Sequence, residues 1–280
     1  MEQEAAKTYL ERSDKLMRIL FLNQGPRAPA VKDDDIAEVE TLLRSYASPG
    51  VEIIYKFVED FPGAMVHEVQ GKAQALNGLY HQLAVPSIVR AIVEASESGF
   101  DAVIQSNTFD PGVEAARLSV PIPVIGLMRT SLAVAATLAD RIGIIAPLDS
   151  DIPSAWRTIC AYQMDHLVVG TKAHNIYSAD IKQRRQEIFD QTVAMGKELV
   201  KDGAQLILPL GGRIIPYIVD PRHIEDATGA PVLNTKAIGI RYAQMCVDLG
   251  LRHSPLAYPP CVAKPEHFSM YAFKTDGGEA

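Results

Sequence analysis

Two segments, Asp101-Ala-Val-Ile-Gln-Ser-Asn-Thr-Phe-Asp-Pro-Gly112 and Gln205-Leu-Ile-Leu-Pro-Leu-Gly-Gly-Arg-Ile-Ile-Pro216, share one pattern. In each, a short apolar run stops abruptly at a small, polar or Gly-rich turn. This pattern predicts a buried strand that delivers a turn to the edge of a sheet. Ligand sites in open parallel sheets form at that edge. Two such edges facing each other would hold a ligand between them.

The composition indicates an ordinary globular protein and excludes several functional classes. The chain has 280 residues, 48% hydrophobic and 22% charged, which is enough for one large or two modest domains. A net charge of -7 gives no electrostatic reason to bind nucleic acid. No apolar stretch reaches the roughly 18 residues of a membrane span, and the charged N-terminus lacks a signal peptide's apolar core. The three scattered cysteines form neither a disulfide framework nor a CxxC metal site, so a cytoplasmic setting is expected.

Apolar runs and helical periodicity alternate twice along the chain, at an offset of roughly 100 to 120 residues, the size of one small domain. This alternation implies parallel sheets with right-handed crossovers. We predict an α/β fold of two pseudo-symmetric lobes, each a mainly parallel four-stranded sheet flanked by helices, with the ligand cleft between them. The alternative is a single continuous doubly wound sheet. The expected divisions are an N-terminal extension (1–17), a first lobe (18–127), a second lobe (128–234), and a closing helix and tail (235–280) that pack back on the first lobe or on a neighbouring subunit.

The expected strands cover residues 18–23, 51–57, 102–105 and 124–127 in the first lobe, and 141–146, 166–169, 206–208 and 231–234 in the second. Helices are expected over 33–47, 73–98 with an interruption near Pro86, 131–140, 179–201 and 235–249.

A known family shares several of these features. The strand ending in Asn23, the turn 107–112, the segment Ile122-Pro-Val-Ile-Gly126 and the turn Leu208-Pro-Leu-Gly-Gly212 together resemble the aspartate/glutamate/hydantoin racemase superfamily, and its hydantoin racemase branch most. The likeness spans about residues 18 to 250. It implies two pseudo-symmetric lobes and activity without metal or organic cofactor. Typical racemases of this family carry one cysteine after the third strand of each lobe, and the two thiols serve opposite faces of one carbon.

This chain departs from that pattern at both cysteine positions. In the first lobe the position falls on Ser106 or Asn107, and in the second lobe Leu210 takes the cysteine's place. The cysteines that are present lie elsewhere: Cys160 and Cys246 are expected on helices and Cys261 in the tail. A serine hydroxyl does not act alone as a base near neutral pH and leucine has no acid–base group, so two-thiol racemisation is not expected.

The two turns supply the candidate site. Their backbone N–H groups suit a carboxylate or a developing oxyanion, glycines allow close approach, and arginines grip carboxylates at two points. The competing structural interpretations are tight turns, surface salt bridges, and a helix cap at Asp110. We predict no metal ligands. The predicted catalytic residues are Ser106, Asn107 and Asp110, and the predicted substrate-binding residues are Asn23, Thr108, Arg129, Gly211, Gly212 and Arg213.

These observations favour a cofactor-independent enzyme of hydrolase or lyase type that acts on a small carboxylate, cyclic amide or lactone. One alternative is a racemase or isomerase whose base is not a cysteine, such as Asp110 or His174. The other is a non-catalytic small-molecule binding protein. The expected partner is a small anionic or cyclic amide substrate, and the family resemblance implies a homo-oligomer.

Overall fold

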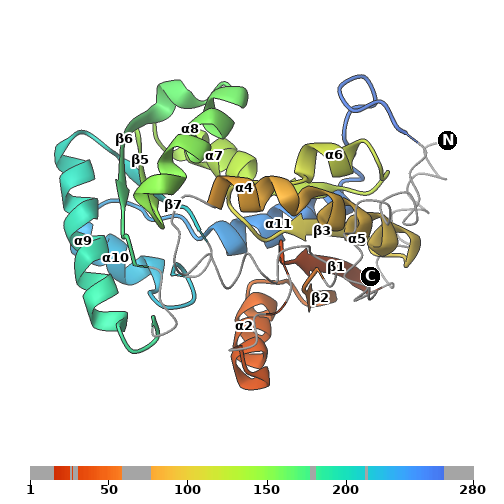
Figure 1. Cartoon of the computed structure of the whole chain (residues 1–280), viewed down its shortest axis with the longest axis horizontal. Helices are drawn as coiled ribbons and strands as arrows, with labels where there is room; N and C mark the ends of the chain where they lie inside the picture. The colour runs from red at the N-terminus through yellow and green to blue at the C-terminus, as the bar shows by residue number, and fades with distance from the viewer. Residues whose placement is uncertain are drawn as a thin grey trace, which may run out of the picture.

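The computed structural model describes residues 16–25, 27, 31–58, 77–176, 181–211 and 214–261. Its framework is two separate parallel sheets, so the alternative of one continuous sheet is wrong (Figure 1). The first sheet has the order β2-β1-β3-β4. Its strands are β1 (Met17–Leu22), β2 (Val51–Lys56), β3 (Ala102–Gln105) and β4 (Val124–Gly126).

The second sheet repeats this order with one difference. Its strands are arranged β6-β5-β7, with β5 at Ile142–Ala146, β6 at Val168–Ala173 and β7 at Leu206–Pro209. The predicted fourth strand (231–234) is reduced to one parallel bridge between Ile207 and Val232. Asn234 then caps the next helix.

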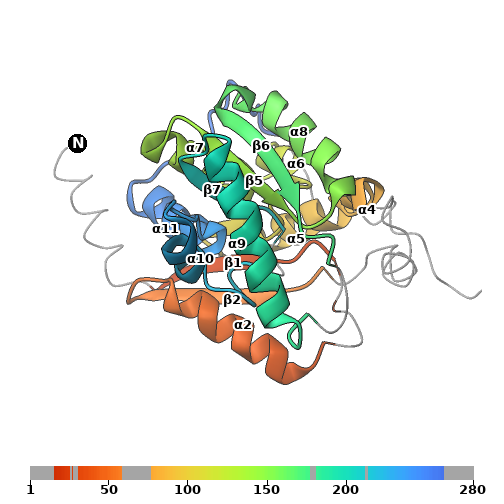
Figure 2. The same cartoon turned by 90° about the vertical axis from the view of Figure 1, so that its left-hand side faces the viewer.

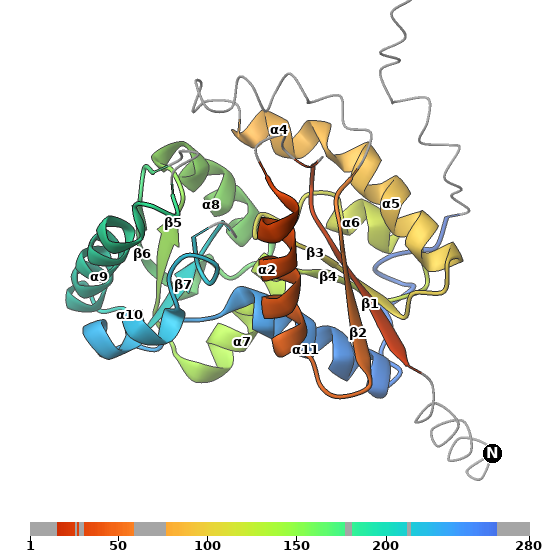
Figure 3. The same ribbon diagram turned by 90° about the horizontal axis from the view of Figure 1, so that it is seen from below.

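Helices cover both faces of the first sheet, as Figure 3 shows. One face packs against α5 (Val85–Glu97) and α6 (Val113–Arg117), and α4 (Asn77–Leu83) precedes them. The other face packs against α2 (Asp33–Ser45) and α11 (Thr235–Asp248). The predicted closing helix therefore contacts the first sheet, although it follows the second in the chain.

The second sheet is covered in the same way (Figure 2). One face packs against α9 (Arg185–Lys201) and α10 (Pro221–Thr228). The other face packs against α7 (Leu127–Leu138) and α8 (Ile152–Ala161). No described helix has both the length and the apolar character needed to cross a bilayer.

One apolar core joins the two lobes. It contains Phe109 from the turn after β3 and Met128 from α7, together with Leu206, Leu208 and Leu210 from β7 and its turn. Because apolar interiors are close-packed, this shared core fixes the ends of β3 and β7 relative to each other. The C-terminal edges of the two sheets therefore meet at these turns.

Candidate active site

The turns after β3 and β7 are in direct contact, as their places at two strand ends predict. The hydroxyl oxygen of Thr108 in the first lobe accepts a hydrogen bond from the backbone N–H of Gly211 in the second. Leu210 is only 4% exposed and packs in the same core as Phe109. Thr108, predicted to bind substrate, thus forms a hydrogen bond that links the two lobes.

Several backbone N–H groups of these turns are already bonded within the protein. The N–H of Asn107 donates to Gln105 Oε1 at 2.8 Å, and the N–H of Phe109 donates to Asn107 Oδ1 at 2.8 Å. The N–H of Gly211 is occupied by Thr108. In this conformation, these N–H groups therefore do not form the anion-binding site that the sequence predicts.

A polar network lies at the end of β1 and β3, on the face of the sheet covered by α2 and α11. The Ser106 hydroxyl donates to Asn23 Oδ1 at 2.9 Å, and Asn23 Nδ2 donates to the Tyr55 hydroxyl. The ammonium or amine of Lys236 donates to the Ser106 carbonyl oxygen. Two predicted residues, Asn23 and Ser106, are thereby joined to two that sequence analysis missed, Tyr55 and Lys236.

Lys236 is buried beneath the turn, with 1% of its surface exposed. Asn234 caps α11 by accepting the Ala237 N–H at 3.0 Å, and the helix then packs on β3 and β4 with Lys236 directed at Ser106. Burial lowers the pKa of Lys236 to about 7, although the nearby Asp110 carboxyl acts in the opposite direction. No ion pair to a described carboxylate compensates for this burial.

The second lobe contributes Tyr217, from the segment 214–219 that follows β7. Its neighbours Ile214, Ile215 and Ile218 are anchored in the second core. Burial raises the pKa of the Tyr217 phenol well above its usual value, with further contributions from Tyr55 and another first-lobe phenol. Tyr217 therefore stays protonated near neutral pH and can act as a proton donor from the second lobe.

Asp110 caps a helix in this structure. Its carboxylate accepts the N–H groups of Met128 at 2.9 Å and Arg129 at 3.0 Å, and the Tyr162 hydroxyl at 3.0 Å. It thus caps the first turn of α7, which lacks a capping side chain of its own. A Cβ on Gly126 would come within 2.5 Å of this carboxylate, so glycine is required there. Asp110 thus caps α7 in this structure, and its catalytic role stays a prediction.

Replacing Asp110 with alanine is expected to lower the free energy of unfolding by about 3 kcal/mol, because two helix N–H groups and a buried hydroxyl lose their acceptor. The matched control is Asp220→Ala, which removes an exposed cap with a single bond to Arg222 N and should cost only about 1 kcal/mol. Urea unfolding of both variants measures the difference. Equal costs would contradict the capping role.

Comparison with known proteins agrees with this architecture. The family model described as Asp/Glu/Hydantoin racemase matches residues 37–243. The chain belongs to the Asp/Glu/hydantoin racemase family.

Two curated relatives of the family are hydantoin racemases. The protein from Pseudomonas sp. (strain NS671) is 27% identical over 175 residues, 62% of this chain and 69% of the relative. The protein from Rhizobium meliloti is 25% identical over 196 residues, 68% of this chain and 79% of the relative. Among solved structures, allantoin racemase from Pseudomonas fluorescens has a TM-score of 0.74 at 21% identity and covers 89% of this chain and 98% of its own, which shows a shared fold.

The cysteines of this family member lie away from the two turns. Cys160 is exposed on α8, and Cys261 is exposed beside the Leu118 carbonyl. Cys246 is buried on α11, ten residues after Lys236, which corresponds to roughly 15 Å along a helix. The described residues contain no group of three or more His, Cys, Asp or Glu that could hold a metal ion.

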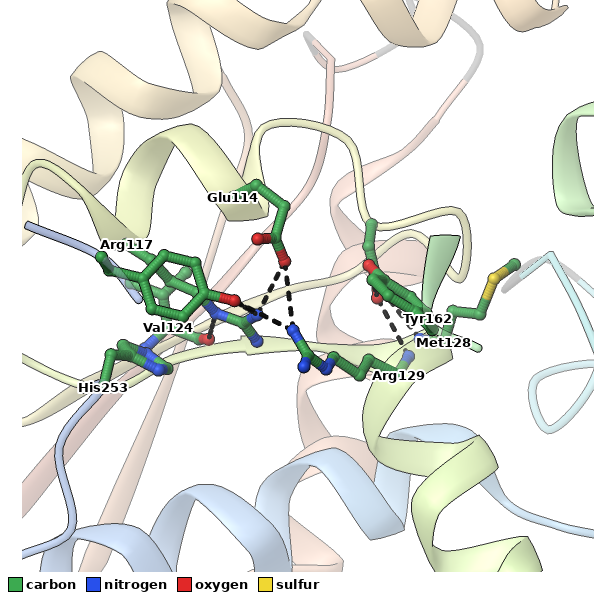
Figure 4. Close-up of polar contacts among 9 residues, drawn as sticks. Glu114, Arg117, Val124, Met128, Arg129, Tyr162 and His253 are labelled. Atoms are coloured by element: carbon green, nitrogen blue, oxygen red, sulfur yellow. Dashed lines mark hydrogen bonds and ion pairs between the residues drawn. The ribbon is translucent and has the colours of Figure 1, made fainter. Parts of the chain in front are cut away.

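Of the two arginines predicted to bind substrate, the structure describes Arg129 but not Arg213. Arg129 donates to the Tyr258 hydroxyl at 2.9 Å, pairs with Glu114 at 3.6 Å and lies over the ring of Tyr162. Its guanidinium is thus committed to a surface cluster with the C-terminal segment (Figure 4). Gly212 and Arg213 lie outside the described residues.

Among the described residues, His81 and His174 are the most deeply buried histidines. His81 of α4 bonds Gln24 Oε1 at 3.0 Å and stacks on Phe109 with ring centroids 4.9 Å apart. His174 bonds the Thr192 hydroxyl at 2.8 Å, on α9, which covers the side of the second sheet turned away from the first lobe (Figure 1). Burial lowers the pKa of each to about 4. His174, one of the alternative bases considered from sequence, is thus bonded to α9.

Proposed function

We propose that this protein is a cofactor-independent racemase or isomerase that moves a proton at the carbon beside a carbonyl group of a small cyclic amide. The comparisons favour this alternative over the hydrolase or lyase chemistry that the sequence analysis placed first. The hydantoin and allantoin racemase names of its relatives point to five-membered cyclic ureides as the substrate class.

The observation that carries this proposal is the meeting of the two turns beside a polar, sulfur-free network. The first lobe supplies Ser106, Asn23 and Lys236, and the second lobe supplies Tyr217. Inversion of a carbon needs one group that takes a proton and another that returns one to the opposite face. A family member with Leu210 in place of the second thiol must obtain both functions from other side chains.

Proton exchange in D2O tests the proposal directly. Enantiopure 5-substituted hydantoins and allantoin are incubated with the protein and followed by proton NMR and chiral chromatography. We expect deuterium to enter at C5 together with loss of enantiomeric excess, unaffected by EDTA or iodoacetamide. A heat-inactivated sample corrects for the spontaneous exchange of hydantoins.

Two other results would contradict the proposal and favour one of the alternatives. Ring-opened products would indicate the hydrolase or lyase alternative. A ureide that raises the melting temperature, but neither exchanges nor disappears, would indicate a binding protein.

A further inference from the structure

Lys236 is an unusual residue for the interior of this fold. Its side chain is fully buried, its Nζ bonds the Ser106 carbonyl oxygen, and the Phe21 ring lies 5.8 Å from it. An ammonium group carries three donors, whereas a neutral amine needs fewer partners and retains a lone pair. Among the described residues, the Ser106 carbonyl oxygen is the hydrogen-bond acceptor of Nζ, and one acceptor suits the neutral amine better than the cation, although the Phe21 ring attracts a cation weakly.

The other described groups of the network do not act as bases near neutral pH. Asn23, Tyr55 and Ser106 carry amide or hydroxyl groups, which do not accept a proton in that range. Asp110 already accepts three hydrogen bonds. His81 bonds Gln24 Oε1 and stacks on Phe109, and burial lowers its pKa to about 4, which makes it a weak base.

We propose that the Lys236 amine is the base that removes the substrate proton in the first lobe. It would take the chemical role that a thiolate has in typical racemases of this family. This inference rests on the proposed function. The C–H bond beside the carbonyl breaks, its electron pair forms an enolate, and a new N–H bond makes Lys236 an ammonium. Tyr217 then donates its phenol proton to the opposite face of the carbon, and the resulting phenolate regains a proton from water as the Lys236 ammonium releases one.

The electrostatics of the site support this role. A base must be unprotonated at the working pH, and burial brings the pKa of Lys236 down to about 7. Asp110, from the turn after β3, is the charged group that acts on Nζ among the described residues, and its attraction is weaker than the effect of burial. The neighbouring phenols of Tyr55 and Tyr217 are neutral acids.

The conformation described here is closed over Lys236. Lys236 is 1% exposed and its Nζ bonds the Ser106 carbonyl oxygen, so a substrate reaches Nζ only after the turn that carries Ser106 moves.

Substitutions of Lys236 test whether its side chain acts as the base or only positions the turn that carries Ser106. Lys236→Met should lower the exchange rate of 5-substituted hydantoins by roughly 10²- to 10⁴-fold. Lys236→Arg should fail to restore it, because the guanidinium keeps a donor for Ser106 but cannot give up its proton. The exposed α9 variant Lys197→Met is the matched control and should exchange at the wild-type rate. Activity retained in Lys236→Arg would overturn the inference.

A titration that needs no substrate keeps this test separate from the test of the proposed function. Protein labelled with ¹³C at lysine Cε gives one resonance that is missing from Lys236→Met and thereby reports Lys236. We expect its midpoint near pH 7. A midpoint at or above 10 would overturn the inference even if hydantoins exchange. If no ureide exchanges, the proposed function fails, and a midpoint near 7 still supports the amine as the base of the site.

Discussion

Acidification from pH 6.5 towards pH 4 should destabilise the protein steeply, because three histidines are held neutral in the folded state. Burial lowers the pKa of His81, His174 and His253 from the ordinary 6.5 to about 4. The unfolded chain therefore binds more protons than the folded chain in this window. Stability from these groups is fully present above pH 6.5 and is lost as the pH falls towards 4.

The expected slope is large. Each proton taken up on unfolding contributes about 1.4 kcal/mol per pH unit, so His81 and His174 together give about 2.7. His253 is less buried and adds less. The raised pKa of Asp110 offsets part of the loss, because its folded-state carboxyl takes up a proton earlier than the unfolded one.

Urea unfolding at several pH values between 4.5 and 7 measures this slope. The variant His174→Gln should reduce it by about 1.4 kcal/mol per pH unit, whatever its stability at pH 7. The control His166→Gln changes an exposed histidine and should leave the slope unchanged. A flat stability profile over this range in the wild type would contradict the neutral, buried state of these side chains.

Lys236→Met should make the protein more stable at pH 7 while it removes proton transfer. A pKa of about 7 in place of the ordinary 10.5 corresponds to a cost of burial of about 5 kcal/mol. The methionine leaves the Ser106 carbonyl without its donor, which costs about 1–3 kcal/mol. The net gain is about 2–4 kcal/mol, or roughly 3 to 7 °C in melting temperature for a chain of 280 residues.

The pH dependence of this gain in stability follows from the direction in which burial shifts the pKa of Lys236, which is downward. Between pH 7 and 10.5 the unfolded lysine is protonated and the folded one is not, so wild-type stability rises with pH in this range. The advantage of Lys236→Met should be largest at or below pH 7 and should shrink towards pH 10.5. Differential scanning calorimetry at pH 7 and pH 9.5 measures it. A variant less stable than the wild type at both values would mean that the lysine is well solvated in the fold.

The fold was largely predictable because strands and helices follow from local periodicity. The apolar runs that end at Ser106 and Leu210 became β3 and β7, and their polar turns met at the sheet edges. The interruption near Pro86 became the break between α4 and α5. The apolar run 231–234 resembles the run that forms β4, so local periodicity did not predict its reduction to one bridge.

The site was less predictable because it depends on contacts between distant segments. Lys236 in the first turn of a helix is typical of a solvent-exposed side chain, and only the packing of α11 on β3 buries it. Tyr55 and Tyr217 carry no local pattern that indicates a site. Asp110 was correctly recognised as a possible cap, but its helix is α7 rather than the α6 that follows it directly.

Deuterium exchange in a cysteine-free variant tests the central claim most directly. Cys160→Ser, Cys246→Ala and Cys261→Ser together remove every sulfur nucleophile while leaving the network of Ser106 and Lys236 in place. If the two turns move a proton without a thiol, the folded variant will exchange the C5 proton of 5-substituted hydantoins at the wild-type rate. Loss of exchange in a variant that still folds would show that a cysteine performs the chemistry and would contradict the account.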